Sequence, residues 1–164
     1  MVIRHAKSSW DDPSVADHDR PLSKRGRKAL DKLCEHLETL GLIPDVVMCS
    51  SSLRTRETLD GVRPVLGPQT RVVTDTALYA AGAERLLTEL RRLDEDVDTV
   101  FLIGHNPGVA DLVELLAVDA AAGGAALETF PTAAVAVLSV AGPWAALQSD
   151  SAALKSFWTP RQTR

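Results

Sequence analysis

Arg4 and His5 stand side by side where the short apolar run at residues 1–4 ends. A neutral imidazole can attack phosphorus, and a guanidinium beside it can hold the oxygens of the attacked group. The pair alone is a weak signal, because a single histidine is more often a packed or solvated side chain. It gains weight from Arg54 and His105, since each of them also follows an apolar run with the pattern of a strand.

Phosphoryl transfer needs a nucleophile and cations around the three equatorial oxygens. We expect His5 to be the nucleophile, while Arg4 and Arg54 grip phosphate oxygens in the planar, bidentate manner that lysine cannot match. A protonated His105 would add an N–H donor and stabilise negative charge in the transition state. These roles require His5 to be neutral and His105 to be charged.

The elements that must position these residues alternate between strand and helix, which is typical of an α/β fold. Ser23 is expected to cap the first helix, and Gly41 to end it. The expected strands are residues 1–4, 45–49, 71–74, 99–103, 134–140 and 144–148. The expected helices cover residues 24–40, a segment from Ser51 or Ser52 to near Pro64, residues 84–93 and residues 108–117. Residues 120–126, rich in Ala and Gly, are expected to be a loop. The tail at 155–164 is expected to be short and polar apart from Phe157 and Trp158, which should dock it on the body.

We therefore predict a single domain over residues 1–164, a three-layer α/β/α sandwich with a mostly parallel sheet and an antiparallel edge strand at 144–148. Ligands of open α/β sheets bind beyond the carboxyl ends of the strands. Arg4, His5, Arg54 and His105 all follow strands, so they should meet at that edge. Gly104 and Gly108 would let the backbone approach the ligand closely.

The composition excludes several other classes of protein. The formal net charge is −4, so general binding to nucleic acid or anionic membranes is not expected. No apolar run approaches the roughly 20 residues of a membrane helix, and no secretory signal is visible. Cys34 and Cys49 are expected to be buried thiols, which suits a reducing cytoplasm. The size and scattered charges are compatible with a monomer, and we expect the native first strand to begin a few residues earlier.

Other chemistries fit the sequence less well. His36 should be exposed, His18 sits between Asp17 and Asp19, and no carboxylate-rich ligand spacing joins His5 to His105, so no metal site is expected. A P-loop is absent, and the serines lack the Gly-x-Ser-x-Gly elbow of serine hydrolases.

The sequence resembles the histidine phosphatase superfamily, in the branch of the phosphoglycerate mutases and the SixA-type phosphohistidine phosphatases. The motifs that carry the resemblance are residues 4–10 (Arg-His-Ala-Lys-Ser-Ser-Trp), 19–26 (Asp-Arg-Pro-Leu-Ser-Lys-Arg-Gly), 51–58 (Ser-Ser-Leu-Arg-Thr-Arg-Glu-Thr) and 104–108 (Gly-His-Asn-Pro-Gly). The resemblance covers most of the chain. It implies His5 as nucleophile, a phosphate pocket of Arg4, Arg54 and His105, and neither metal nor organic cofactor.

Two departures from the mutase-like pattern bear on the substrate. Asp11 stands where that pattern has Asn, and we expect it to turn away from the phosphate or to pair with Lys7. The loop at 77–83 has no acid before Glu84, where mutase-like enzymes carry a Glu proton donor. An alkoxide leaving group gains about 10²- to 10⁴-fold from general-acid help, whereas the imidazole of phosphohistidine can be protonated beforehand. The expected substrate is therefore phosphohistidine on a protein, or a similarly labile phospho-compound.

Two alternatives stay open at this point. A phosphatase for small phosphomonoesters would need Asp11, Asp19 or Glu84 as the acid. A phosphate-binding module without catalysis would have no need for His5. Arg20 is expected to be a structural clamp that ties the long loop to the site by an ion pair.

Overall fold

A computed structural model of the chain describes residues 1–118 and 129–161. Its centre is a six-stranded sheet in the order β3-β2-β4-β1-β5-β6. Four parallel strands occupy one side of the sheet, and β5 and β6 complete it in antiparallel orientation. The strands are β1 (Val2–Arg4), β2 (Val46–Ser50), β3 (Arg71–Asp75), β4 (Val100–Gly104), β5 (Val135–Val140) and β6 (Ala152–Trp158). The expected α/β fold, mostly parallel with an antiparallel edge, is confirmed.

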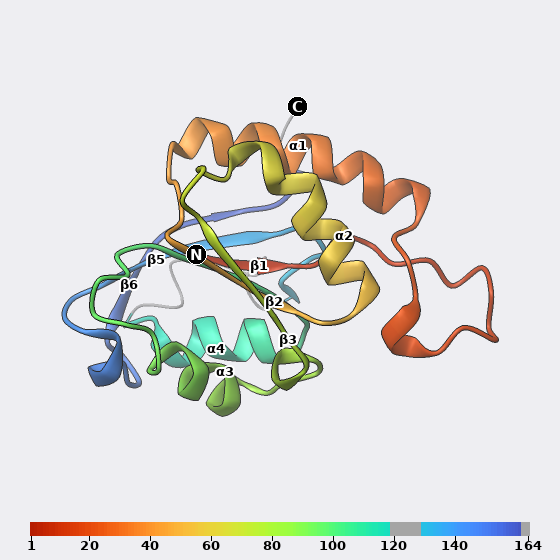
Figure 1. The fold of residues 1–164 in the computed structure, drawn as a ribbon. Coiled ribbons are helices and arrows are strands. Elements are labelled where there is room, and N and C mark those ends of the chain that lie inside the picture. The colour runs from red at the N-terminus through yellow and green to blue at the C-terminus, as the bar shows by residue number, and fades with distance from the viewer. Residues whose placement is uncertain (119–128, 162–164) are drawn as a thin grey trace.

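Helices cover both faces of this sheet, as Figure 1 shows. The pair α1 (Lys24–Leu40) and α2 (Leu53–Val62) lies over one face, and the pair α3 (Ala83–Leu90) and α4 (Gly108–Leu116) lies over the other. Both predicted caps of α1 are present: the Ser23 side chain accepts a hydrogen bond from the Gly26 amide, and Gly41 adopts the left-handed conformation. The expected three layers are therefore present.

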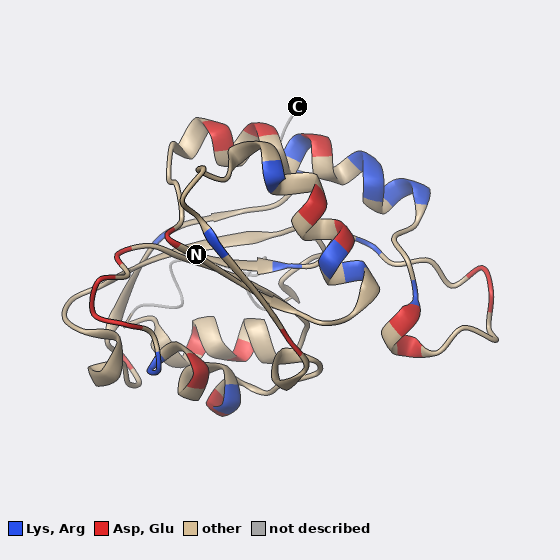
Figure 2. Ribbon diagram, viewed as in Figure 1, with Lys and Arg blue, Asp and Glu red and all other residues tan. Residues whose placement is uncertain are grey.

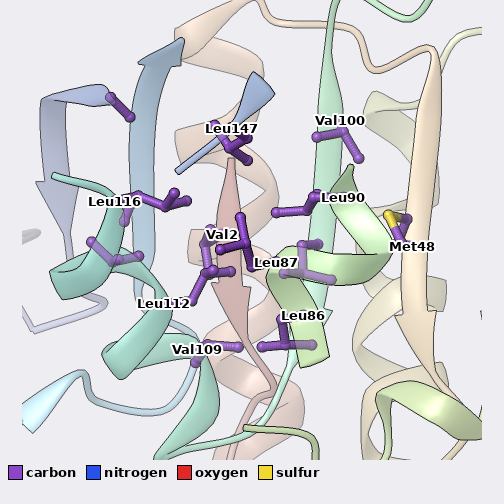
Figure 3. Close-up of a cluster of buried hydrophobic side chains, with 14 of the residues drawn as sticks. Val2, Met48, Leu86, Leu87, Leu90, Val100, Val109, Leu112, Leu116 and Leu147 are labelled. Carbon is purple, nitrogen blue, oxygen red and sulfur yellow. The ribbon is translucent and has the colours of Figure 1, made fainter. Parts of the chain in front are cut away.

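Alternation along the central strands explains why both faces need a cover. Val2 and Leu102 point to the α3–α4 side, whereas Ile3 and Ile103 point to the α1–α2 side. Figure 3 shows the first of these two clusters, in which Leu86 and the other leucines of α3 and α4 meet the sheet. A sheet buried on both faces fixes its strands firmly, so the loops at its carboxyl edge start from rigid points.

The prediction of an edge strand at 144–148 is wrong. Trp144–Ala146 is a short 3-10 helix, and Leu147 is buried beneath the sheet. The indole of Trp144 donates a hydrogen bond to the Val97 carbonyl, so the apolar run serves packing rather than strand pairing. The antiparallel edge strand is β6, so residues 155–158 of the expected tail form a strand, and Phe157 and Trp158, expected to dock the tail on the body, are part of it.

Three smaller expectations can also be compared with the structure. His36 is half-buried rather than exposed, because its ring stacks on Trp158 at a centroid distance of 4.4 Å. Cys49 is buried and Cys34 is half-buried, and both are free thiols. The loop expected at 120–126 lies outside the described residues. Within the part of the chain that the structure describes, no helix is long and apolar enough to cross a membrane.

Candidate active site

The carboxyl ends of β1, β4 and β2 lie next to one another. Arg4 pairs with Gly104, and Cys49 pairs with Ile103, so the segments that follow these strands leave the sheet at the same edge. The four side chains expected there, Arg4, His5, Arg54 and His105, line one pocket of about 630 Å³. The predicted convergence is therefore present in the structure.

His5 is held by both its backbone and its ring. Its amide donates to the Gly104 carbonyl at 3.1 Å, and ring atom Nδ1 lies 2.7 Å from the Ala6 carbonyl oxygen. A carbonyl oxygen can only accept, so Nδ1 carries the proton and Nε2 keeps its lone pair. Burial, with a smaller effect of nearby positive charge, lowers the pKa of His5 to about 3. The ring is therefore neutral at ordinary pH, as a nucleophile must be.

Arg4 and Arg54 bring two guanidinium groups to the pocket; Arg54 is buried and Arg4 is half-buried. Arg4 donates through Nη1 to the Phe130 carbonyl at 2.7 Å, and Arg54 donates through Nη2 to Asp17 Oδ2 at 3.0 Å. The Nε atom of each arginine is buried without a partner in the described residues. Buried donors that lack a partner cost free energy, and an anion with several oxygens would satisfy them.

His105 contacts its neighbours through both ring nitrogens. Nε2 lies 2.7 Å from Ser50 Oγ, and Nδ1 lies 3.3 Å from Arg54 Nη2. A guanidinium only donates, so Nδ1 accepts and the ring is neutral in this arrangement. Burial, followed by the charge of Arg54, lowers the pKa of His105 to about 4. This differs from the expected charged state, because Arg54 lies so close to the ring.

Asp17 is a site residue that sequence reasoning missed. It lies in the long loop before α1, and its carboxylate accepts hydrogen bonds from Arg20, Arg54 and Tyr79. The Tyr79 hydroxyl and the two arginines hold the pKa of Asp17 well below its usual range. The available signal was a short acidic segment directly before Arg20, but sequence alone does not place such a loop over the pocket.

The three carboxylates considered as proton donors do not line the pocket. Asp11, Asp19 and Glu84 have exposed side chains outside its lining. Asp17 is the one carboxylate that lines it in the described part of the chain, and it is already engaged by two arginines. Lys7 and Asp11 form no ion pair among the described residues, so the pairing expected for Asp11 is not seen.

Arg20 is the clamp that its position predicted. Its guanidinium pairs with Asp17, reaches Ser8 Oγ at 3.4 Å, and lies 3.5 Å from the ring centre of Trp10. It is buried, although it stands in a long loop. These contacts join the start of the loop to its end and so hold Asp17 against Arg54.

Other motif residues hold the backbone around the site. Thr58 Oγ1 accepts from the Ala6 amide at 3.0 Å, and Glu57 accepts from the Leu22 amide. A Cβ on Gly26 would meet the Lys7 carbonyl at 2.1 Å, and one on Gly108 would meet the Ala81 carbonyl at 1.9 Å. The close approach at Gly108 is therefore to the protein's own backbone, not to a ligand as expected.

The remaining histidine near the pocket belongs to the same loop. His18 contacts Asp19 through Nδ1 and Ser51 Oγ through Nε2, each at 2.9 Å. No group of three or more His, Cys, Asp or Glu residues that could hold a metal ion occurs in residues 1–118 and 129–161.

Comparison with known proteins adds independent information. Residues 1–98 match the model of the histidine phosphatase superfamily, branch 1. An uncharacterised protein of Mycobacterium tuberculosis is 36% identical over 163 residues, which cover 97% of this chain and 100% of that protein. Such a match extends the family likeness beyond the pocket to nearly the whole chain.

Two solved structures assigned as phosphohistidine phosphatase SixA have the same fold. The one from Nakamurella multipartitia shows a TM-score of 0.79 at 31% identity and covers 97% of this chain and 95% of its own. The one from Agrobacterium tumefaciens shows a TM-score of 0.78 at 25% identity, with 97% and 96% covered. This likeness supports phosphatase activity. Since the family model matches more than half of the chain and the SixA folds match nearly all of it, the chain belongs to branch 1 of the histidine phosphatase superfamily, with a SixA-type structure.

Proposed function

We propose that the chain hydrolyses phosphohistidine, on a protein or in a similarly labile phospho-compound, through a phosphohistidine intermediate on His5. The lone pair of His5 Nε2 is available for attack, since Nδ1 donates to the Ala6 carbonyl. Arg4 and Arg54 line the same pocket, and the buried Nε–H group of each has no partner in the described residues. These features supply the nucleophile and the cations that phosphoryl transfer needs.

The choice of substrate rests on one observation: the pocket contains no carboxylate that is free to donate a proton, among the described residues. Asp17, the one carboxylate lining the pocket within the described residues, is paired with Arg20 and Arg54. Its pKa is held well below the usual range, so it carries no proton to give to a leaving group. A basic alkoxide would lack general-acid help here, whereas an imidazole can leave after it has been protonated on its other nitrogen.

The proposed reaction has two steps. In the first, His5 Nε2 forms a bond to phosphorus while the bond from phosphorus to the substrate imidazole breaks, and the substrate leaves as neutral imidazole because its other nitrogen already carries a proton. In the second, a water oxygen attacks the phosphorus and the bond to His5 Nε2 breaks, which gives inorganic phosphate and restores the neutral ring.

His105 has a binding role in this proposal. A phosphoryl group carries a charge of about −2 and raises the pKa of an imidazole beside it. Substrate binding would thus oppose the effect of Arg54, which now lowers the pKa of His105. His105 then becomes a donor to a phosphate oxygen only when the anion is bound.

The test compares two substrate classes with the same purified protein. A phosphohistidine-containing protein or peptide should be hydrolysed well, and a simple phosphomonoester poorly. Rapid alkaline quenching of a single turnover with labelled substrate should trap phosphate on His5, and the His5→Asn variant should trap none. Efficient hydrolysis of phosphomonoesters with no action on phosphohistidine would overturn the proposal. Failure to trap phosphate in the wild type would favour a non-catalytic phosphate-binding module.

The same comparison addresses the phosphomonoesterase alternative. Asp11, Asp19 and Glu84 lie outside the pocket lining, so replacing each by its amide should leave turnover of phosphohistidine nearly unchanged. A collapse of turnover in one variant alone would identify a proton donor. The free thiols of Cys34 and Cys49 fit the reducing cytoplasm, where we propose that the protein acts.

A further inference from the structure

A second, smaller cavity adjoins the catalytic pocket. Its volume is about 110 Å³, and it shares Lys7, Pro131, Thr132 and Arg161 with the pocket that contains His5. Arg25, in the first turn of α1, also lines it. Three cations from three separate segments of the chain therefore meet beside the catalytic pocket.

These cations exceed what the phosphoryl group and the pocket carboxylate can balance. Arg4, Arg20 and Arg54 together carry three positive charges, which Asp17 and a phosphoryl group of about −2 neutralise. The charges of Lys7, Arg25 and Arg161 are additional. None of these three has an ion-pair partner within 4.0 Å in the described part of the chain, and no carboxylate lines the smaller cavity there.

Besides Asp17, the acidic residues near this group line a neighbouring hollow. That hollow also includes Lys7 and Arg25, and it contains Asp11 and Asp12. With Arg20 already paired with Asp17, the further cations Lys24 and Arg27 keep the hollow positive in sum. The local excess of positive charge thus persists when every carboxylate around Lys7 and Arg25 is counted.

Helix stability does not account for this arrangement. The first turn of α1 contains no acidic residue, yet Lys24, Arg25 and Arg27 all lie there or next to it. Positive side chains at a helix N-terminus oppose the helix dipole, so these three cations do not stabilise the start of α1. Figure 2 shows Lys and Arg gathered over the beginnings of α1 and α2, although the formal net charge of the chain is −4.

We propose that Lys7, Arg25 and Arg161 form an anion subsite, which binds a second carboxylate or phosphate group of the molecule whose phosphoryl group lies at His5. This proposal rests on the proposed function only in placing the phosphoryl group at His5. Lys7 follows His5 by two residues, so their Cα atoms are at most about 7 Å apart. We take this backbone spacing as the scale of the separation between the phosphorus and the second anion, about 7 Å, which an acidic side chain near a phosphohistidine can span.

The first test measures binding without turnover. Phenylphosphonate and 4-(carboxymethyl)phenylphosphonate present the same phosphoryl mimic, and the second adds a carboxylate at about the required distance. Calorimetry should show that the wild-type protein binds the carboxylated compound about three- to tenfold more tightly. Each exposed ion pair strengthens binding by less than about tenfold, and several cations can contact the added carboxylate. The advantage should shrink when the salt concentration is raised.

Two matched variants identify the residues involved. Arg25→Gln removes a cation that lines the smaller cavity but not the catalytic pocket. Lys28→Gln removes an exposed cation of the same helix that lines neither cavity. The advantage of the carboxylated compound should fall at least about twofold in Arg25→Gln and persist in Lys28→Gln. Equal loss in both variants, or no advantage in the wild type, would overturn the subsite.

A kinetic arm distinguishes the source of the anion. One pair of phosphohistidine peptides differs only in Glu or Gln beside the phosphohistidine, and one pair of aryl phosphates differs only in a carboxymethyl group. A higher kcat/KM for the Glu peptide than for the Gln peptide would assign the subsite to acidic protein segments. A higher kcat/KM for the carboxylated aryl phosphate than for its unsubstituted partner would assign the subsite to small molecules. If phosphohistidine is not hydrolysed at all, the proposed function fails while the phosphonate measurements still decide the subsite.

Discussion

The hydrogen bond between His5 Nδ1 and the Ala6 carbonyl determines which ring nitrogen can react. It fixes the proton on Nδ1, and burial keeps the ring from gaining a second proton by lowering the pKa of His5 to about 3. Arg54 acts on the other histidine, since its Nη2 lies 3.3 Å from His105 Nδ1. Arg54 also contacts Asp17, so a single guanidinium links the loop, the second histidine and the phosphate pocket.

Arg54→Lys should therefore be far more damaging than the retained charge suggests. A lysine cannot keep the contacts to Asp17 and His105 while it also grips two phosphate oxygens. We expect kcat/KM to fall by about 10²-fold, as for loss of a donor to a transition-state oxygen. Arg56→Lys is the matched control, because Arg56 lies two positions further on the exposed face of α2. Steady-state kinetics with phosphohistidine peptide would check this; equal activity of both variants would contradict the role given to Arg54.

At the scale of elements, α2 is tied to the loop that carries His5. Thr58 Oγ1 donates to the Arg54 carbonyl at 2.7 Å and accepts from the Ala6 amide at 3.0 Å. One hydroxyl therefore links the turn of α2 that presents Arg54 to the residue directly after His5. The position of the two side chains relative to each other depends on this link.

Thr58→Val should weaken both stability and activity. Valine keeps the shape of threonine but leaves the buried Ala6 amide without an acceptor, which costs about 1–3 kcal/mol of unfolding free energy. Thr88→Val is the matched control, since Thr88 Oγ1 also donates to the carbonyl four residues earlier but is exposed on α3. Urea denaturation would measure the difference, and kcat should fall only in Thr58→Val. A cost for Thr88→Val as large as that for Thr58→Val would refute the proposed link.

Sequence alone predicted the elements that carry their own periodicity. The buried strands β2 and β4 and the capped helix α1 follow from apolar runs and from Ser23 and Gly41. The edge strand could not be found in this way, because β6 is only partly buried, whereas the run at 144–148 contributes Leu147 and part of Trp144 to the packing under the sheet. The sequence did not predict Asp17 as a site residue for a similar reason: its position depends on ion pairs with Arg20 and Arg54, not on a local pattern.

At the scale of the whole molecule, charge is distributed unevenly. The chain has a formal net charge of −4, yet the charged residues that line the pocket and its neighbouring cavity are all cations except Asp17. Lys and Arg gather near the carboxyl edge of the sheet, where the long loop and the beginnings of α1 and α2 lie (Figure 2). Such a field favours anions at one edge of an otherwise acidic protein, and it adds to the effect of burial in lowering the pKa of the two pocket histidines.

The buried neutral histidines should make the stability of the whole protein depend on pH. The pKa of His5 is about 3 in the folded chain, whereas an unfolded histidine has a pKa of about 6.5. Below about pH 6.5 the unfolded state therefore binds a proton that the folded state refuses, so the free energy of unfolding falls as the pH falls. The slope should reach about 1.4 kcal/mol per pH unit for this histidine near pH 5.

His5→Asn removes the titrating group. The free energy of unfolding of this variant, measured by urea denaturation between about pH 7 and pH 4, should therefore decline less steeply than that of the wild type, by about this amount. Parallel curves for the two proteins would show that His5 takes up its proton equally in the folded and unfolded states, and the lowered pKa of the buried His5 would then be wrong.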